Sequence, residues 1–117
     1  MTEEPLHIAV ADFLRAALPL DAVFHHSPNE GRHTKGYRAR QLRKGMRPGW
    51  PDLEVLHDGS MLFFEAKTPQ GSLSVAQRRC HADIEAAGGF VTTVRSVDEV
   101  EMYLRMCGVP LRASVAA

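Results

Sequence analysis

Two periods of hydrophobicity alternate along the chain and predict a mixed α/β protein. Apolar residues spaced three or four apart mark helices, while short runs of β-branched and aromatic residues mark strands. Helices are predicted over residues 3–18, 35–44, 74–87 and 97–107. Strands are predicted over residues 22–26, 53–57, 61–64 and 90–94. The order α-β-(α)-β-β-α-β-α predicts an α/β sandwich in which helices flank a small mixed β-sheet.

The central hairpin has the most specific local pattern. Asp58-Gly59 separates the runs 53–57 and 61–64. An Asp-Gly pair between strands predicts a two-residue turn, because both turn positions need a positive φ. His57 would then face Ser60, which fixes every further pair of the hairpin. One face of the hairpin would be apolar and face the core, with Leu53, Val55, Leu62, Phe64 and Ala66.

The same register brings two carboxylates together. Asp52 would lie directly opposite Glu65, with Cβ atoms about 4.5–5.5 Å apart, and Lys67 would point to the same side. One interpretation is a solvated polar face that also includes Glu54, with an ion pair worth about 0–1 kcal/mol. The other is a functional site. It is favoured because the acids lie at the strand ends far from the turn and close to a basic segment.

Two facing carboxylates repel each other, and a divalent cation is the natural compensation. Mg²⁺ prefers hard oxygen ligands, commonly one or two carboxylates completed by water and phosphate oxygens. Lys67 beside Glu65 suits the orientation of an attacking water or the stabilisation of charge on phosphate. Paired carboxylates also serve glycoside hydrolysis, but that chemistry gives Lys67 and the basic segment no role. The set therefore favours phosphodiester hydrolysis.

Charge is unevenly distributed although the net charge of the 117 residues is zero. Residues 31–49 contain no acidic side chain. Such a run is commonly a solvated face or a mobile loop. It also fits phosphate contacts that position DNA without reading its sequence. The candidate DNA-binding residues are Arg32, Lys35, Arg38, Arg40, Arg43, Lys44 and Arg47.

Length, cysteine content and hydropathy predict one cytoplasmic domain over residues 1–117. Cys80 and Cys107 form no metal or redox spacing, and both are expected to be reduced and buried in helices. Cys80-His81, together with the other histidines, has no zinc-ligand spacing. No segment approaches the roughly 18 apolar residues of a membrane span.

Pro51-Asp52 followed by Glu65-Ala66-Lys67 resembles the PD-(D/E)xK motif of restriction-endonuclease-like nucleases. The wider pattern resembles the VRR-NUC domain in its standalone form, over nearly the whole chain. The further residues that carry this resemblance are Thr2-Glu3, Leu6, Val10, Pro28-Asn29-Glu30-Gly31-Arg32, Gly45, Pro48-Gly49, Gly71-x-Leu73-Ser74-x-x-Gln77 and Gly89-x-Val91. The resemblance implies a restriction-endonuclease-like three-layer sandwich.

The resemblance also implies roles for individual residues. Asp52, Glu65 and the backbone carbonyl of Ala66 would bind a metal, and Lys67 would be the catalytic lysine. Glu3 matches an acid that reaches the site from the first helix, and Gln77 matches a glutamine that supports the site. His7 stands where the family often has glutamine, which leaves its role open.

Glu3 and Gln77 each have a second interpretation. Glu3 is also a common type of residue in the first turn of a helix, although it falls on the apolar side of this one. Ser74-x-x-Gln77 is also a capping box, in which the glutamine side chain reaches back to the first amide of the helix. Both roles therefore stay open for each residue.

Together these observations predict a Mg²⁺- or Mn²⁺-dependent DNA endonuclease. Standalone members of the family resemble Holliday junction resolvases, which implies a branched DNA substrate and a homodimer. The alternative is a nuclease-like module that binds branched DNA or a protein partner without cutting it. Retention of Asp52, Glu65 and Lys67 together favours the enzyme.

Overall fold

The computed structural model describes residues 2–28 and 34–115, and within them the predicted order of elements is confirmed. Each observed boundary lies within three residues of its predicted position. The helices are α1 (Glu4–Ala17), α2 (Lys35–Arg43), α3 (Val75–Ala86) and α4 (Val97–Met106). The strands are β1 (Val23–His26), β2 (Leu53–His57), β3 (Ser60–Ala66) and β4 (Phe90–Val94).

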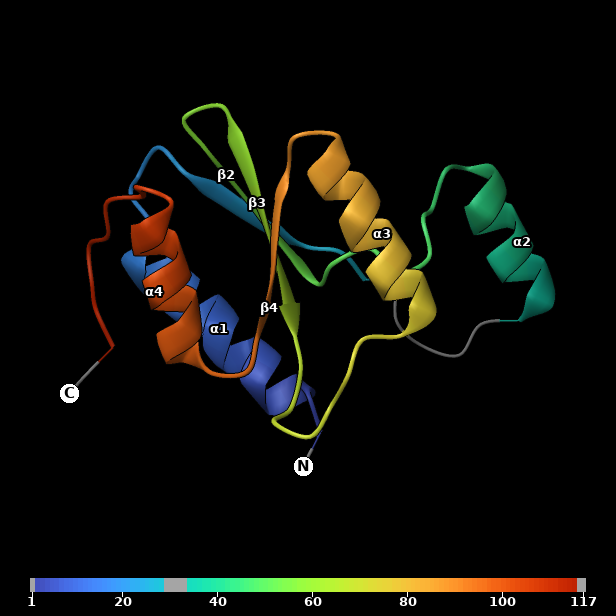
Figure 1. Ribbon diagram of the computed structural model, residues 1–117, viewed down its shortest axis with the longest axis horizontal. Coiled ribbons are helices and arrows are strands. Elements are labelled where there is room, and N and C mark those ends of the chain that lie inside the picture. The colour runs from blue at the N-terminus through green and yellow to red at the C-terminus, as the bar shows by residue number, and fades with distance from the viewer. Residues whose placement is uncertain (1, 29–33, 116–117) are drawn as a thin grey trace.

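The four strands form one mixed sheet in the order β1-β2-β3-β4. The pairs β1–β2 and β2–β3 are antiparallel, whereas β3 and β4 are parallel. A parallel pair needs a long crossover, and α3 supplies it. Figure 1 shows α1 and α4 on one face of the sheet and α3 on the other. The predicted three-layer α/β sandwich is confirmed.

The hairpin has the predicted turn and register. Asp58 and Gly59 have φ values of 49° and 77°, so both turn positions are left-handed, as a type I′ turn requires. The pairing runs from His57 opposite Ser60 to Leu53 opposite Phe64. Side chains on one strand alternate between the two faces of the sheet. The sequence of the turn therefore determines which residues of β2 and β3 reach the core.

The main core lies between the sheet and the layer of α1 and α4. The predicted apolar face of the hairpin is buried there: Leu53, Val55, Leu62, Phe64 and Ala66. The helices contribute Val10, Leu14, Val100 and Leu104. A smaller cluster on the opposite face joins Phe63 of β3 to Cys80 and Ile84 of α3, with Trp50 packed against it. Both faces of β3 are therefore covered, and this central strand is the most deeply enclosed.

The helix α2 stands apart from both cores. It buries no side chain, and Figure 1 shows it beyond α3, away from the sheet. Thr34 caps it, because its hydroxyl accepts a hydrogen bond from the Tyr37 amide at 3.1 Å. The helix therefore forms as predicted, but local bonds rather than core packing define it.

The cysteine prediction is half wrong. Cys80 is buried in α3, but Cys107 is exposed, at the residue that follows α4. Apolar spacing alone extended the last helix by one residue too many. In the part of the chain that the structure describes, no helix is long and apolar enough to cross a membrane.

Candidate functional site

Asp52 lies immediately before β2 and is fixed against β3. Its side chain is buried, and its Oδ2 accepts a hydrogen bond of 2.8 Å from the amide of Ala66. The Asp52 carbonyl accepts a second bond, of 3.0 Å, from the amide of Ser27. Pro51, also buried, delivers the chain in an extended conformation. One bond therefore holds the carboxylate of Asp52 and the other holds its main chain.

Glu65 is the penultimate residue of β3 and has no exposed surface. It shares a sheet face with Phe63, on the side that α3 covers. The Nε2 atom of His81, on α3, lies 3.2 Å from Glu65 Oε1. The polar solvated face that the sequence also allowed is therefore wrong at this end of the hairpin, because Asp52 and Glu65 are both buried.

Lys67 follows β3 directly, and its amide donates a 3.0 Å hydrogen bond to the carbonyl of Val94. Its side chain is almost fully buried, and its Nζ lies 3.8 Å from Glu3 Oε1. That separation is an ion pair rather than a short hydrogen bond. Glu3 is the N-cap residue of α1, with no capping bond from its own side chain. The structure therefore brings Glu3 to the catalytic lysine that the resemblance implies.

His81 is buried beside Glu65. Burial lowers the pKa of its imidazole, while the carboxylates of Glu85 and Asp52 raise this pKa and the ammonium of Lys67 lowers it. Asp52 bonds the amide of Ala66, which lies between Glu65 and Lys67 along the chain. Three contacts thus meet at residues 65–67: Asp52 with Ala66, His81 with Glu65, and Glu3 with Lys67. These five side chains, Glu3, Asp52, Glu65, Lys67 and His81, are called here the carboxylate site.

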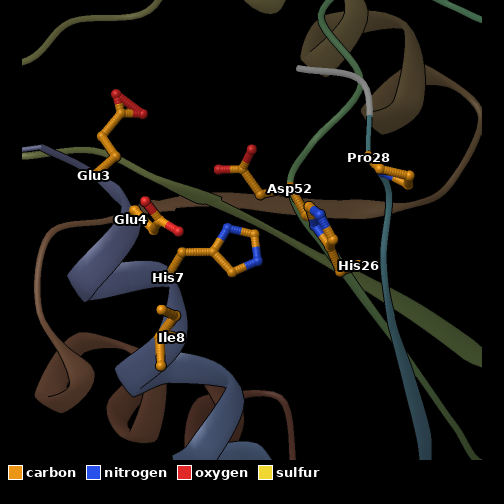
Figure 2. Close-up of a pocket in the computed structure, with 7 residues that line it drawn as sticks. All are labelled: Glu3, Glu4, His7, Ile8, His26, Pro28 and Asp52. Atoms are coloured by element: carbon orange, nitrogen blue, oxygen red, sulfur yellow. The ribbon is translucent and has the colours of Figure 1, made fainter. Parts of the chain in front are cut away.

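A cavity of about 390 Å³ opens beside Asp52. Its lining consists of Glu3, Glu4, His7, Ile8, His26, Pro28 and Asp52. Figure 2 shows the side chains of α1 facing those of Asp52 and His26 across the space. The rings of His7 and His26 meet edge to face, with centroids 4.5 Å apart, and His26 Nδ1 is 3.2 Å from the Asp52 carbonyl. His7, whose role the sequence leaves open, therefore lines the cavity beside Asp52.

Gln77 forms the capping box that its spacing predicts. Its side-chain oxygen accepts a 2.9 Å bond from the amide of Ser74, and its own amide donates to Ser74 Oγ at 3.1 Å. The capping interpretation is confirmed. Support of the carboxylate site by Gln77 stays a prediction.

The donor atoms of the carboxylate site fit a hard cation. Among the described residues, no three side chains of histidine, cysteine, aspartate or glutamate come together as a metal-binding group. A cation between Asp52 and Glu65 would therefore complete its coordination with backbone, water or phosphate oxygens. This is the pattern typical of Mg²⁺, which keeps several waters and uses one or two carboxylates.

The basic segment lies on and after α2. Lys35, Arg38, Arg40, Arg43 and Lys44 are exposed there. Arg47 donates a 2.7 Å hydrogen bond to Asp83 of α3, which ties the end of the segment to the body of the protein. Arg32 lies outside the described residues.

His81 is the residue that sequence reasoning missed. In the sequence it stands beside Cys80 and has no zinc-ligand spacing. Its position four residues after Gln77 and three before Ile84 places it on the inner face of α3. A histidine on the core-facing side of a helix predicts a buried polar partner for its ring. The sequence did not identify Glu65 as that partner.

Comparison with known proteins places the fold. No protein-family model and no curated protein matches the sequence. A solved structure described as a VRR_NUC domain protein superposes with a TM-score of 0.65 at 19% identity, over 90% of this chain and 86% of the other. A second, described as a VRR_NUC domain, gives 0.60 at 23% identity, over 88% and 94%. The chain therefore has the VRR-NUC fold that the sequence predicted.

Proposed function

We propose that this protein is a Mg²⁺- or Mn²⁺-dependent endonuclease that hydrolyses phosphodiester bonds of branched DNA. One observation carries the proposal: Asp52 and Glu65 are both buried, and Asp52 bonds the amide of Ala66, between Glu65 and Lys67. Burying two acids beside each other costs free energy unless a cation or proton donors compensate. A site with no function has no reason to keep that arrangement on a fold shared with nuclease-domain proteins.

Asp52 and Glu65, with the backbone carbonyl of Ala66, would hold the metal. The bound ion would lower the pKa of a water and neutralise charge developing on the phosphate. The residues of the chain do the positioning. Asp52 is held by the Ala66 amide, and Glu65 is held inside the central strand. Both ligands are therefore set before any substrate arrives.

Lys67 supplies a positive charge beside the two acids. Its ammonium is positioned to orient the attacking water or to stabilise the phosphate oxygens. Glu3 lies 3.8 Å from that ammonium and limits the directions in which it points. The first helix thus contributes to the site without holding the metal, and the cavity in front of Asp52 gives the substrate a path to it.

The basic residues of α2 would bind the phosphate backbone. They are exposed, and they extend from the body of the protein on a helix without core contacts (Figure 1). Such contacts position a duplex arm without reading its sequence. A symmetric homodimer would present two carboxylate sites to the strands of a junction. We therefore place Lys35, Arg38, Arg40, Arg43, Lys44 and Arg47 at the DNA, with Arg32 as a further candidate.

The test is a panel of Holliday junction, flap, fork, single-stranded and duplex substrates at low salt, each with Mg²⁺ or Mn²⁺. The wild type is expected to cut branched DNA, and Glu65→Gln is expected to bind it without cutting. An Arg38→Ala/Arg40→Ala/Arg43→Ala variant should bind more weakly, with a smaller dependence on salt. Binding without cleavage by the wild type would instead establish the non-catalytic binding module.

A further inference from the structure

The histidine on α3 makes a contact that none of the roles above explains. His81 and Glu65 come from different layers, and their side chains are 8% and 0% exposed. An ionised carboxylate only accepts hydrogen bonds. A carboxylate metal ligand must be ionised, so in the metal-binding state the 3.2 Å contact to Glu65 Oε1 needs a proton on His81 Nε2.

The helix that carries His81 is packed against β3 by apolar side chains next to it. Cys80, just before it, is fully buried, and Ile84, one turn later, packs against Phe63 of β3. Phe63 stands two residues before Glu65 on the same face of the strand. The hydrophobic contact and the histidine contact therefore fix the same stretch of β3 against the same helix.

From this geometry we propose that His81 is a positioning residue, which orients Glu65 toward the metal by holding its Oε1. The proposal rests on the proposed function. A hydrogen bond to one carboxylate oxygen stops rotation of the group and so fixes the direction of the other oxygen. Partners of this kind commonly affect metal affinity by about 10–100-fold when they are removed.

A matched pair of substitutions tests whether a hydrogen-bond donor at position 81 must reach Glu65. His81→Gln places an amide nitrogen near the position of Nε2, whereas His81→Asn places one near Nδ1, too short to reach Glu65. Both variants are polar and of similar size. Mn²⁺ affinity is measured by calorimetry on the full chain, and unfolding is measured separately with chelator present.

The expected result is an Mn²⁺ affinity about 10–100-fold weaker in His81→Asn and within a few-fold of wild type in His81→Gln. His25→Gln is the control, because His25 contacts Glu54 at 3.3 Å in an exposed pair outside the carboxylate site. It should leave Mn²⁺ affinity unchanged. If His81→Asn does not fold, His81→Leu takes its place in the same comparison.

Equal Mn²⁺ affinities for wild type, His81→Gln and a folded His81→Asn or His81→Leu would overturn the inference. Equal losses in all His81 variants, in proportion to their loss of stability, would also overturn it and leave His81 as a packing residue. A wild type that binds no Mn²⁺ and cuts no DNA would refute the proposed function itself. The two failures are therefore distinguishable.

Discussion

Gln77 has two candidate roles, as a capping residue of α3 and as a support of the carboxylate site, and substitutions in the capping box distinguish them. Gln77 bonds the Ser74 amide and Ser74 bonds the Gln77 amide, at 2.9 and 3.1 Å. Removing either side chain leaves one of the first amides of the helix without its partner. Replacing a capping serine by alanine costs about 0.5–2 kcal/mol. Both bonds are exposed, so we expect about 1 kcal/mol for Ser74→Ala and for Gln77→Ala.

The assay compares the two variants by thermal unfolding and by cleavage of branched DNA. A loss of about 1 kcal/mol lowers the Tm of a domain of this size by about 4 °C. If capping is the whole role of Gln77, both variants lose this much and cleave equally well at 25 °C. Ser96→Ala is the control, because Ser96 caps α4 by accepting the Glu99 amide at 3.2 Å.

Two results would contradict a purely capping role for Gln77. An unchanged Tm for Gln77→Ala would show that its capping bond contributes nothing. A loss of cleavage of tenfold or more in Gln77→Ala alone, with Ser74→Ala unaffected, would place the glutamine in the carboxylate site, as the family resemblance implies.

Three further perturbations test other parts of the structure. Gly49→Ala should destabilise the fold far more than Gly88→Ala. Both glycines have a positive φ, which costs an alanine about 1–2 kcal/mol, but a Cβ at Gly49 would also overlap the α3 backbone, while one at Gly88 meets open space. Equal melting temperatures for the two variants would contradict the close contact of Gly49 with α3. Glu3→Gln should reduce cleavage severalfold with little change in Tm, because it removes the charge 3.8 Å from Lys67 Nζ but no core contact; unchanged cleavage would remove Glu3 from the site. Burial raises the pKa of Tyr103, so the folded state favours the neutral phenol. The free energy of unfolding should therefore fall as the pH rises through the ordinary tyrosine pKa of about 10. Between about pH 9 and about pH 11 this free energy should fall more steeply for wild type than for Tyr103→Phe, and parallel curves would contradict the prediction.

The fold was predictable where short-range chemistry decides it. Asp58-Gly59 determined the turn, and the turn determined the register that buries Leu53 and Phe64 on one side. Because each residue shift reverses the faces of a strand, this one dipeptide also placed Glu65 under α3. The sequence pattern was sufficient for these features, since every step involves residues close along the chain.

The site was predictable only in part, because its contacts join residues that are far apart along the chain. The contact of His81 with Glu65 joins a helix to a strand, and its existence depends on how α3 packs. Helical spacing shows that His81 faces inward but not which strand residue it meets. The burial of Asp52 and Glu65 likewise depends on the layer above them. The resemblance to a nuclease family suggested that layer, but hairpin pairing alone did not.

Cleavage of a Holliday junction by wild type and Glu65→Gln, in Mg²⁺ at low salt, decides whether Glu65 serves metal-dependent hydrolysis. Glu65→Gln keeps the size of a fully buried side chain and an oxygen that accepts from His81, but it removes the charge that a cation needs. We expect the wild type to cut the junction, and a folded Glu65→Gln variant to bind it but cut it at about a hundredth of the wild-type rate or less. Equal cleavage by the two proteins would contradict this role of Glu65.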